Sequence, residues 1–541
     1  MKAGWYGKLI LLILLSFSFV TIFLYLSIRI IIFITLDFPW YEKLLASVLL
    51  LAELFVLIQS TGYFINIFYV LLHSLKKTDP PPIIFDTYPP VAVIVPSYKE
   101  PLEIIQNTLI CTYNLSYPNK RIYLLDDTRY DLPWDTDENK EKYRKAVDEL
   151  CRWVGVSLFR ANWHGAKAGI INDFMQFLDG NFLPGFEFIP AEKYESKEIE
   201  KYIAVFDSDM NPIPEFLEEP VFIMEKNPKI AFVQTPQYYT NFETNRIARV
   251  AGLQQAIFYE YICEGKGLQG AMFCCGTNVL LRREALKDVG GFDEESVTED
   301  FATSLKMHIK GWESVYLNRV AAFGMGPQDL AGFFKQQFRW ARGNLGILKG
   351  LPLKMWSSLH KMPLNIWWEY WLACTHYLVG WVFLVMVLFP VMYLFFNVPS
   401  YFADPVLYFF SFVPYIIFSF AVFFLTLKVK RYRAIDMLST TLINAVTFPI
   451  YIKASINALL GIKVTFGITP KDGSTILPLR ALFPQILLNL MCFAAVIWGL
   501  LRIYYERDPV YALAVNVFWC FYNFTLIGFF LHFNHSEEST T

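Results

Sequence analysis

Long uncharged apolar runs constrain this chain more than any other feature, because each needs a membrane or a very large core to bury it. The first, residues 9–28 (LILLILLSFSFVTIFLYLSI), is long enough to cross about 30 Å of hydrocarbon. No small-residue cleavage site follows it, so we interpret it as a retained span and not as a signal peptide. In total we predict about six spans, near residues 9–28, 44–73, 366–396, 404–427, 479–503 and 510–533.

Composition separates the two ends of the chain from its middle. The chain is 55% hydrophobic and 18% charged, and its charged residues gather between residues 76 and about 350. We therefore expect two N-terminal transmembrane helices (1–76), a soluble domain (77–350), and a C-terminal part (351–541) with interfacial helices, a polar stretch at 462–475 and about four spans. The net charge of −2 argues against nucleic acid as a partner. Eight cysteines without a C-x-x-C pair argue against a zinc site or a disulfide framework and favour a reducing, cytosolic location.

Basic residues in the loops predict the orientation. One side of the predicted spans carries Lys2, Lys8, Lys76, Lys77, Lys428, Lys430, Arg431 and Arg433. The opposite loops are short and poor in net positive charge. By the positive-inside rule, both termini and the middle domain are expected to be cytoplasmic, with the chain crossing the plasma membrane.

The middle domain alternates β-branched runs with helical stretches. We predict strands at 91–96, 121–127, 156–159, 202–209 and 230–235, and helices at 101–115, 139–154 and 166–179. This alternation predicts an α/β domain with a mainly parallel, Rossmann-like sheet and a ligand site at the carboxyl ends of its strands. Two aromatic, amphipathic segments, 331–365 and 434–460, are either spacers between spans or a junction between the soluble domain and a membrane path.

Residues whose side chains could bind a ligand or take part in catalysis occur at predicted strand ends and helix starts. Asp126 and Asp127 end one strand, and Asp207 and Asp209 end another as F-D-S-D; such pairs hold divalent cations but are also common turn formers. Further candidates are Lys167 in H-G-A-K-A-G, Asp300 in T-E-D, and Arg339 and Trp340 in Q-Q-F-R-W. Lysine and arginine can bind a diphosphate. A carboxylate can act as a base toward a sugar hydroxyl, and an indole ring can stack on the apolar face of a sugar.

These motifs follow one another in the order DD, HxKAG, DxD, TED and QxxRW within about 215 residues. Together they resemble the processive membrane glycosyltransferases of family 2, which include bacterial cellulose synthase catalytic subunits and the curdlan, hyaluronan and chitin synthases. The resemblance implies a glycosyltransferase-A-type domain between transmembrane helices. It departs from the common family pattern at Thr128, where many members have glycine.

The resemblance also implies a role for each motif residue. Asp300 would be the general base, counted as catalytic together with Glu299 and Asp209. Asp207 and Asp209 would bind Mg²⁺ or Mn²⁺. The residues implied to bind the UDP-sugar are Asp126, Asp127, Lys167, Asp207, Gln336, Arg339 and Trp340.

The stretch Phe466-Gly-Ile-Thr-Pro-Lys471 resembles the FxVTxK gating loop of cellulose synthases, with Ile468 in place of valine. The resemblance implies that Phe466, Thr469 and Lys471 contact the bound nucleotide, and it favours UDP-glucose as donor. A plain connector is the alternative.

Aromatic residues also crowd the start of the third predicted span. Trp367, Trp368, Tyr370 and Trp371 either line a polysaccharide channel or form an interfacial belt. Glu369 and His376 share one helical face within that span and are functional candidates. Arg29 and Glu53 are expected to snorkel or to pair.

The resulting expectation is a processive, inverting β-glucan synthase that polymerises glucose from UDP-glucose onto a growing polysaccharide acceptor and exports the polymer across the lipid bilayer. A β-1,4 linkage is the first choice, followed by a curdlan-type or mixed linkage. The alternatives are a hyaluronan- or chitin-type synthase using UDP-N-acetylglucosamine, a single-transfer enzyme, a two-carboxylate hydrolase, and a non-catalytic transporter. An accessory subunit is possible, and a C-terminal regulatory domain is not expected.

Overall fold

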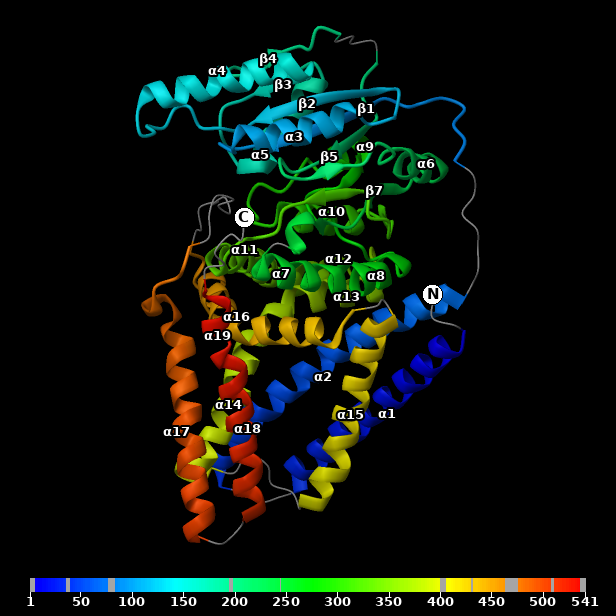
Figure 1. Cartoon of the computed structure of the whole chain (residues 1–541). Coiled ribbons are helices and arrows are strands. Elements are labelled where there is room, and N and C mark those ends of the chain that lie inside the picture. The colour runs from blue at the N-terminus through cyan, green and yellow to red at the C-terminus, as the bar shows by residue number, and fades with distance from the viewer. Residues whose placement is uncertain are drawn as a thin grey trace.

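The computed structural model has two parts, a sheet domain and a helix bundle, joined by a layer of helices that lies across both (Figure 1). It describes residues 5–35, 39–75, 83–193, 198–243, 245–398, 405–429, 432–462, 475–506 and 510–535. We call the joining helices the interfacial layer: α7 (Arg246–Ile257), α8 (Glu264–Leu268), α11 (Leu330–Leu348), α12 (Leu351–Ser358), α13 (Leu364–Thr375) and α16 (Ala434–Leu460).

The sheet domain is built on a mixed sheet that is mostly parallel, as the sequence predicts. Its strands run in the order β10-β7-β9-β5-β1-β2-β3-β4, and β1 pairs in parallel with both β2 and β5. The strands are β1 (Val91–Ser97), β2 (Lys120–Asp126), β3 (Ser157–Arg160), β4 (Glu187–Ile189), β5 (Tyr202–Val205), β7 (Ile230–Gln234), β9 (Val279–Arg282) and β10 (Glu313–Tyr316). A small second sheet joins β6 (Asn211–Pro212), β11 (Ala322–Gly324) and β8 (Tyr238–Tyr239).

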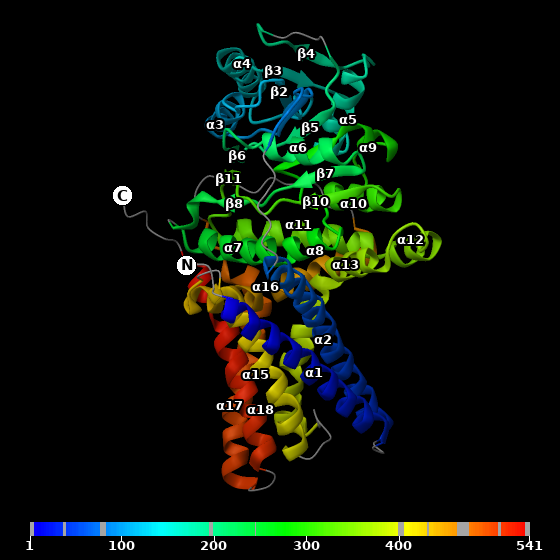
Figure 2. The ribbon, with the colours of Figure 1, turned by 90° about the vertical axis from the view of Figure 1, so that its right-hand side faces the viewer.

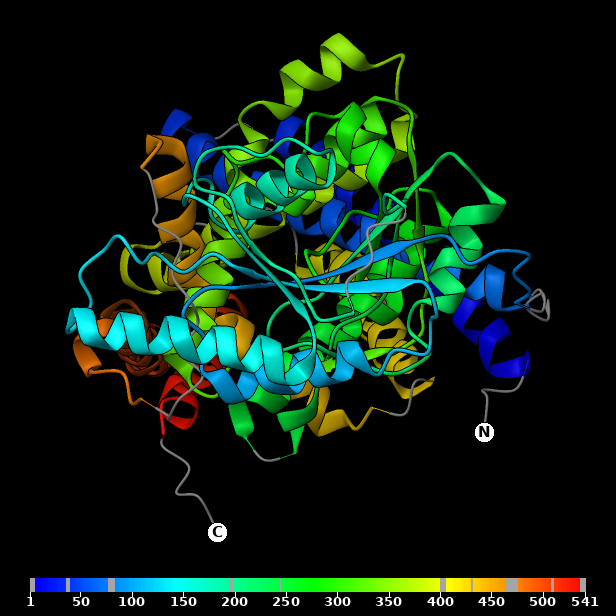
Figure 3. The same cartoon turned by 90° about the horizontal axis from the view of Figure 1, so that it is seen from above.

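Helices cover both faces of the large sheet. One face packs against α3 (Leu102–Tyr113), α4 (Asp137–Val154) and α6 (Glu218–Lys226). The other packs against α5 (Ala166–Leu178), α9 (Arg283–Asp288) and α10 (Glu299–Ile309). Seen from above, the long cyan helix α4 runs along one side of the strands (Figure 3). The alternation of strands and helices in the sequence correctly predicts this layering.

The structure differs from the predicted strands in several places, since β4, β9 and β10 of the large sheet were not predicted and one predicted strand is shorter. The predicted strand at 202–209 stops at Val205, because the backbone turns at Asp207, whose carbonyl accepts the N–H of Met210 at 2.9 Å. β9, which sequence reasoning missed, lies antiparallel between β5 and β7. Its four residues are all buried and do not alternate with polar ones, so they carry no periodic signal.

The bundle contains the predicted spans. Among the described residues, seven helices are long and apolar enough to cross a membrane. Six correspond to the predicted runs: α1 (Trp5–Thr35), α2 (Trp40–Leu75), α13 with α14 (Val379–Phe396), α15 (Pro405–Val429), α17 (Phe483–Glu506) and α18 (Val510–Gly528). The seventh, α16, runs across the direction of α15 and α18, which fits the interfacial segment predicted at 434–460 (Figure 1).

The interfacial layer is closely packed against its neighbours. A Cβ atom on Gly343 of α11 would lie 2.4 Å from Thr298, and one on Gly380 of α14 would lie 2.7 Å from the carbonyl oxygen of Phe448. α12 lies at the outer end of the layer, where Trp356 is 87% exposed (Figure 2). An exposed tryptophan at this level suits the headgroup region of a bilayer.

Candidate active site

A cavity of about 1260 Å³ opens at the carboxyl edge of the sheet and continues into the bundle. Its wall includes residues of the sheet domain, of the interfacial layer, and of α2, α14 and α18. Nine of the predicted site residues line it: Asp127, Lys167, Asp207, Asp209, Glu299, Asp300, Gln336, Arg339 and Trp340. The fold therefore brings together motifs that lie far apart in the sequence.

Asp126 is the exception among the predicted site residues of the described ranges. Its carboxylate accepts hydrogen bonds from Arg160 Nε and from the Tyr130 hydroxyl, both at 2.7 Å, and it does not line the cavity. Asp126 is thus held by protein groups, and its predicted contact with the nucleotide stays a prediction. Asp127 does face the cavity, and burial together with the Asp126 charge raises the pKa of Asp127 to about 7.

Lys167 stands at the start of α5 and reaches the DxD turn. Its ammonium donates to Asp207 Oδ1, and to the carbonyl oxygen of Gly276 at 2.7 Å. Burial alone would lower the pKa of Lys167, but the carboxylates of Asp207 and Glu299 outweigh it and raise the pKa. Lys167 therefore remains a cation facing a cavity that a diphosphate could enter.

Asp300 lies in the first turn of α10, close to the segment Phe273–Gly276. Its Oδ1 accepts the N–H of Phe301 at 2.8 Å. A Cβ atom on Gly276, whose φ is +81°, would lie 2.8 Å from Asp300 Oδ2. Burial and the Glu299 charge raise the pKa of Asp300 to about 7, which is the range that suits a general base at neutral pH.

α11 supplies the opposite wall of the cavity. Its first turn is capped by Asp329, which accepts the N–H of Gly332 at 2.6 Å. Gln336, Arg339 and Trp340 are three and four residues apart, so one face of the helix presents all three to the cavity. The Gln336 amide donates to the Tyr239 hydroxyl at 3.3 Å.

A DxD turn, a lysine, a buried carboxylate and an arginine therefore surround one cavity. A family profile described as glycosyl transferase family 2 matches residues 92–290, and one described as glycosyl transferase family group 2 matches residues 202–427. The chain carries a family 2 glycosyltransferase domain. Relatives named cellulose synthase catalytic subunit match it over much of its length.

Two of these relatives illustrate the extent of the similarity. The UDP-forming cellulose synthase catalytic subunit of Pseudomonas fluorescens is 30% identical over 63% of this chain and 42% of its own length. The UDP-forming cellulose synthase 1 catalytic subunit of Komagataeibacter xylinus is 26% identical over 90% of this chain and 61% of its own length. The chain thus spans less than two thirds of each relative.

The chain is also similar to solved structures of other proteins. A mannosyltransferase from Pyrobaculum calidifontis, in complex with GDP-Man and Mn²⁺, has a TM-score of 0.49 and 15% identity, over 76% of this chain and 100% of that one. At that score the likeness supports no conclusion about ligands.

The residues of the DxD turn suit a hard divalent cation. Asp207 and Asp209 both line the cavity of the glycosyltransferase domain, and carboxylates are preferred ligands of Mg²⁺ and Mn²⁺. In the described ranges no group of three or more His, Cys, Asp or Glu side chains forms a ready metal site. Two carboxylates are nevertheless enough where substrate phosphates complete the coordination, as is usual for Mg²⁺.

Sequence reasoning assigned no role to three groups that support the glycosyltransferase site. Arg160 pairs with Asp126. In the parallel register of β2 and β3, Leu125 lies beside Phe159, so the next residues of the two strands, Asp126 and Arg160, are neighbours as well. A prediction of this strand pairing could have revealed the pair. His164 contacts Glu294 at 2.8 Å and Asp173 at 3.0 Å, so it ties the HxKAG motif to the loop before TED. The hydroxyl of Thr277 accepts the N–H of Asp207 at 2.8 Å and holds the DxD turn.

Thr128, the departure from the family pattern, does not disturb the site. Its φ is negative, so the backbone does not require glycine there. Its hydroxyl accepts the N–H of Lys99 at 3.0 Å, and Lys99 itself has a φ of +50°. Thr128 thus stabilises the turn after β1.

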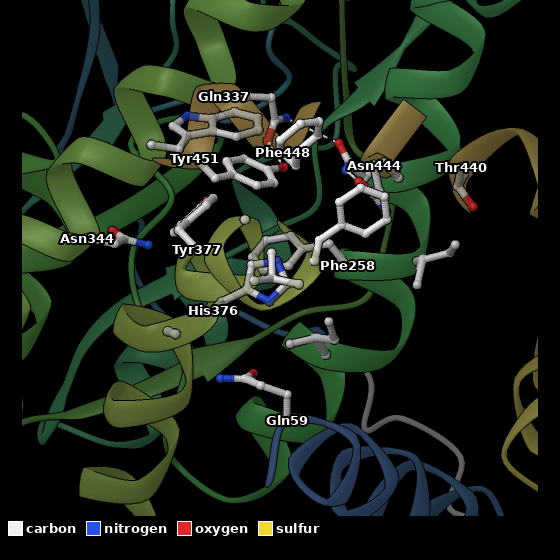
Figure 4. A pocket seen from close by; sticks show the side chains of 18 of the residues that line it. Gln59, Phe258, Gln337, Asn344, His376, Tyr377, Thr440, Asn444, Phe448 and Tyr451 are labelled. Atoms are coloured by element: carbon white, nitrogen blue, oxygen red, sulfur yellow. Dashed lines mark hydrogen bonds between the residues drawn. The ribbon is translucent and has the colours of Figure 1, made fainter. Parts of the chain in front are cut away.

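The membrane side of the cavity is lined by amides and aromatic rings (Figure 4). The Tyr451 hydroxyl donates to Gln337 at 2.9 Å, Gln337 donates to Gln254 at 3.2 Å, and Gln254 donates to Asn444 at 2.7 Å. Neutral amides beside aromatic faces are suited to the hydroxyls and the apolar faces of sugar rings.

The aromatic residues singled out from the sequence lie elsewhere. Trp367, Trp368, Tyr370 and Trp371 do not line the cavity, and Trp367 and Tyr370 are each 1% exposed in an apolar cluster. The aromatic lining of the cavity in the interfacial layer and the bundle comes instead from residues including Phe383, Tyr393, Phe448, Trp519 and Tyr522.

Of the remaining candidates, some lie in the described part of the chain and some do not. Glu369 and His376 both line the cavity, as their shared helical face predicts. Arg29 pairs with Glu53 at 2.7 Å. Phe466, Thr469 and Lys471 lie outside the described residues.

The Arg160–Asp126 pair gives a first testable prediction. Arg160→Met is expected to lower the free energy of unfolding of the sheet domain by about 3–5 kcal/mol, because it leaves the Asp126 carboxylate buried without its cation. Thermal unfolding of the purified protein would show this as a lower Tm. Arg152→Met, at an exposed position of α4, is the control and should leave the Tm unchanged. An unchanged Tm for Arg160→Met would mean that Asp126 is held by other partners.

Proposed function

We propose that this chain is a processive, inverting β-glucan synthase, which polymerises glucose from UDP-glucose and passes the polymer through its own helices. One observation carries the proposal: the cavity that holds Asp300, Arg339 and the DxD turn continues between α2, α14 and α18. An enzyme that released a small product to solvent would have no use for such a continuation. The names of the relatives favour a β-1,4 linkage, with a curdlan-type or mixed linkage next.

Each lining residue has a chemical task in this proposal. Asp300 takes the proton of the acceptor hydroxyl as the hydroxyl oxygen attacks the anomeric carbon. UDP leaves from the opposite face, so the configuration inverts. Arg339 and Lys167 bind the diphosphate, and Trp340 stacks against the acceptor sugar. Asp207 and Asp209 would hold Mg²⁺ or Mn²⁺, which supplies positive charge for the departing diphosphate. We further propose that Phe466, Thr469 and Lys471 bind over the nucleotide.

The location follows from the same proposal. The start of α1 and the short helix α19 (Phe530–Phe533) lie on the side of the bundle that faces the sheet domain (Figure 1). By the positive-inside rule applied to the basic residues of the sequence, we propose that the catalytic domain and both termini are cytoplasmic and that the spans cross the plasma membrane. UDP-sugars would then bind from the cytoplasm and the polymer would emerge outside.

A direct assay tests the proposal. Purified protein in proteoliposomes with Mg²⁺ or Mn²⁺ is given radiolabelled UDP-glucose or UDP-N-acetylglucosamine in separate reactions. The expected result is a high-molecular-weight product from UDP-glucose alone, and linkage-specific glucanases would identify the linkage. Polymer from the amino sugar would favour a hyaluronan- or chitin-type synthase. UDP release without polymer would indicate a single-transfer enzyme or a missing subunit.

The pH dependence of the reaction is a second prediction. Because the pKa of Asp300 is raised to about 7 and the base must be deprotonated, kcat/KM should fall about tenfold per pH unit below 7. The measurement is initial UDP release as a function of pH. Since the pKa of Asp127 is also raised to about 7, the profile is repeated with Asp127→Asn, which should keep the acid limb. A profile that is flat across pH 7, or an acid limb lost in Asp127→Asn, would contradict the assignment of Asp300.

A further inference from the structure

A buried ion pair lies where the cavity passes from the glycosyltransferase domain into the bundle. Lys266 of α8 and Glu369 of α13 pair through Nζ and Oε2, and their side chains are only 3% and 1% exposed. Both residues line the cavity, and so does Asn66 of α2. We call these three residues the Lys266–Glu369 site.

The three residues are held in place by close packing. The Asn66 amide donates to both carboxylate oxygens of Glu369 at 3.4 Å and is itself hydrogen bonded by Gln269 at 3.0 Å. A Cβ atom on Gly265 would lie 2.6 Å from Asn66, so α8 touches α2 directly. These contacts fix the positions of the ammonium of Lys266 and the carboxylate of Glu369 relative to the cavity.

Stability alone is a poor explanation for this pair. Removing two charges from water is unfavourable, and well-packed apolar residues of the same volume are often as stabilising as a buried ion pair. Glu369 belongs to a helical segment, Leu364–Phe396, that is apolar enough to span a membrane, and ionisable groups in such segments are by default candidates for function. Binding of a ligand in the cavity would explain why two charged residues are buried at this position.

A chain of ring contacts joins the Lys266–Glu369 site to the segment that carries Asp300. Phe301, next to Asp300, lies 5.1 Å from the ring of Tyr370, next to Glu369. Phe301 also lies 4.8 Å from Phe273, and Lys266 Nζ lies 5.6 Å from the Phe273 ring. A saccharide that has just been extended at Asp300 would therefore meet the Lys266–Glu369 site as it moves toward α2.

The chemistry of the site matches the hydroxyl groups of a sugar. A carboxylate has about four acceptor positions and an ammonium has three donors, whereas the described contacts of Lys266 Nζ use two, the carboxylate and the carbonyl oxygen of Glu369. Each sugar hydroxyl both donates and accepts, so neighbouring hydroxyls can bind the carboxylate and the ammonium together. Because the pair is neutral overall, it favours a neutral glycan over an anionic one.

We propose that the Lys266–Glu369 site binds hydroxyl groups of the nascent neutral glycan, and so retains the polymer between successive additions. This inference rests on the proposed function. It makes the three residues a determinant of product length, separate from the donor site at Asp207 and Arg339. Their loss should increase polymer release without changing donor binding.

The test uses the double variant Lys266→Met/Glu369→Gln, which removes both charges and leaves no unpaired ion. We expect the mean product length from UDP-glucose to fall about tenfold, since charge-assisted hydrogen bonds to the polymer are lost. The KM for UDP-glucose and the initial rate of UDP release should stay within about twofold of the wild type. Asn66→Ala, which creates no buried charge, should also shorten the product. Folding of each variant is checked by size-exclusion chromatography and Tm.

The matched control is Arg121→Met/Glu200→Gln. It removes a partly buried pair of the sheet domain, 2.9 Å apart, whose members do not line the cavity. This control should make product of wild-type length. Full-length product from either folded test variant would overturn the inference while leaving the proposed function standing. A wild-type protein that makes no polymer would contradict both.

Discussion

Replacing Asp300 with asparagine is expected to lower polymer synthesis by about 10²- to 10⁴-fold, with little change in donor binding. Asparagine has the same shape as aspartate but cannot accept the proton of the attacking hydroxyl. Its side-chain oxygen can still accept the N–H of Phe301, so the first turn of α10 should persist. The measurements are initial rates of UDP release and polymer formation, together with binding of UDP to the purified variant.

Asp293→Asn is the matched control for Asp300→Asn. Asp293 precedes the same helix and pairs with Lys306 at 2.8 Å, but it does not line the cavity. Its variant should keep most of the activity. Wild-type synthesis by Asp300→Asn would remove this residue from the role of base. Transport of a sugar that survives Asp300→Asn, with no synthesis in the wild type, would favour a non-catalytic transporter.

The second large effect is expected at the DxD turn. Asp209→Asn should reduce kcat by about 10²- to 10³-fold, because loss of a carboxylate weakens the neutralisation of the departing diphosphate. The variant should also need a higher concentration of Mg²⁺ or Mn²⁺ for half-maximal rate. A metal titration of the initial rate, with EDTA-treated protein as the starting point, measures both effects.

The control for the DxD turn is Asp131→Asn. Asp131 is exposed, pairs with Arg129 at 2.8 Å and does not line the cavity, so its metal dependence should match that of the wild type. Asp207→Asn tests the same turn from the other side, since it also removes the partner of Lys167. An unchanged metal requirement in both Asp207→Asn and Asp209→Asn would mean that the cation, if needed, is held elsewhere.

Local sequence predicted much of the fold, because the signals were periodic or compositional. The apolar runs predicted the span helices α1, α2, α14, α15, α17 and α18, and alternating β-branched stretches predicted β1, β2, β3, β5 and β7. The short strands escaped prediction. β6 and β8 have two residues each, and they form only because distant segments pair with β11.

The sequence motifs predicted the residues of the site, and the contacts in the structure showed which of them line the cavity. Nine motif residues in the described ranges line one cavity, whereas the adjacent carboxylates Asp126 and Asp127 face in different directions. Asp126 is the last residue of β2, whereas Asp127 lies just beyond the strand and lines the cavity. The other is neutralised by Arg160, a residue that no motif contains.

The sequence by itself determined that the chain spans a membrane, that an α/β domain lies between the spans, and which carboxylates and cations that domain would bring to its sheet edge. These follow from hydrophobic length, periodicity and motif order, which are local properties. Only the tertiary structure decided that Asp126 pairs with Arg160, that the predicted tryptophans lie outside the cavity, and that Lys266 meets Glu369. Each of those outcomes depends on side chains distant in sequence packing at one point, where burial sets which charges must find partners.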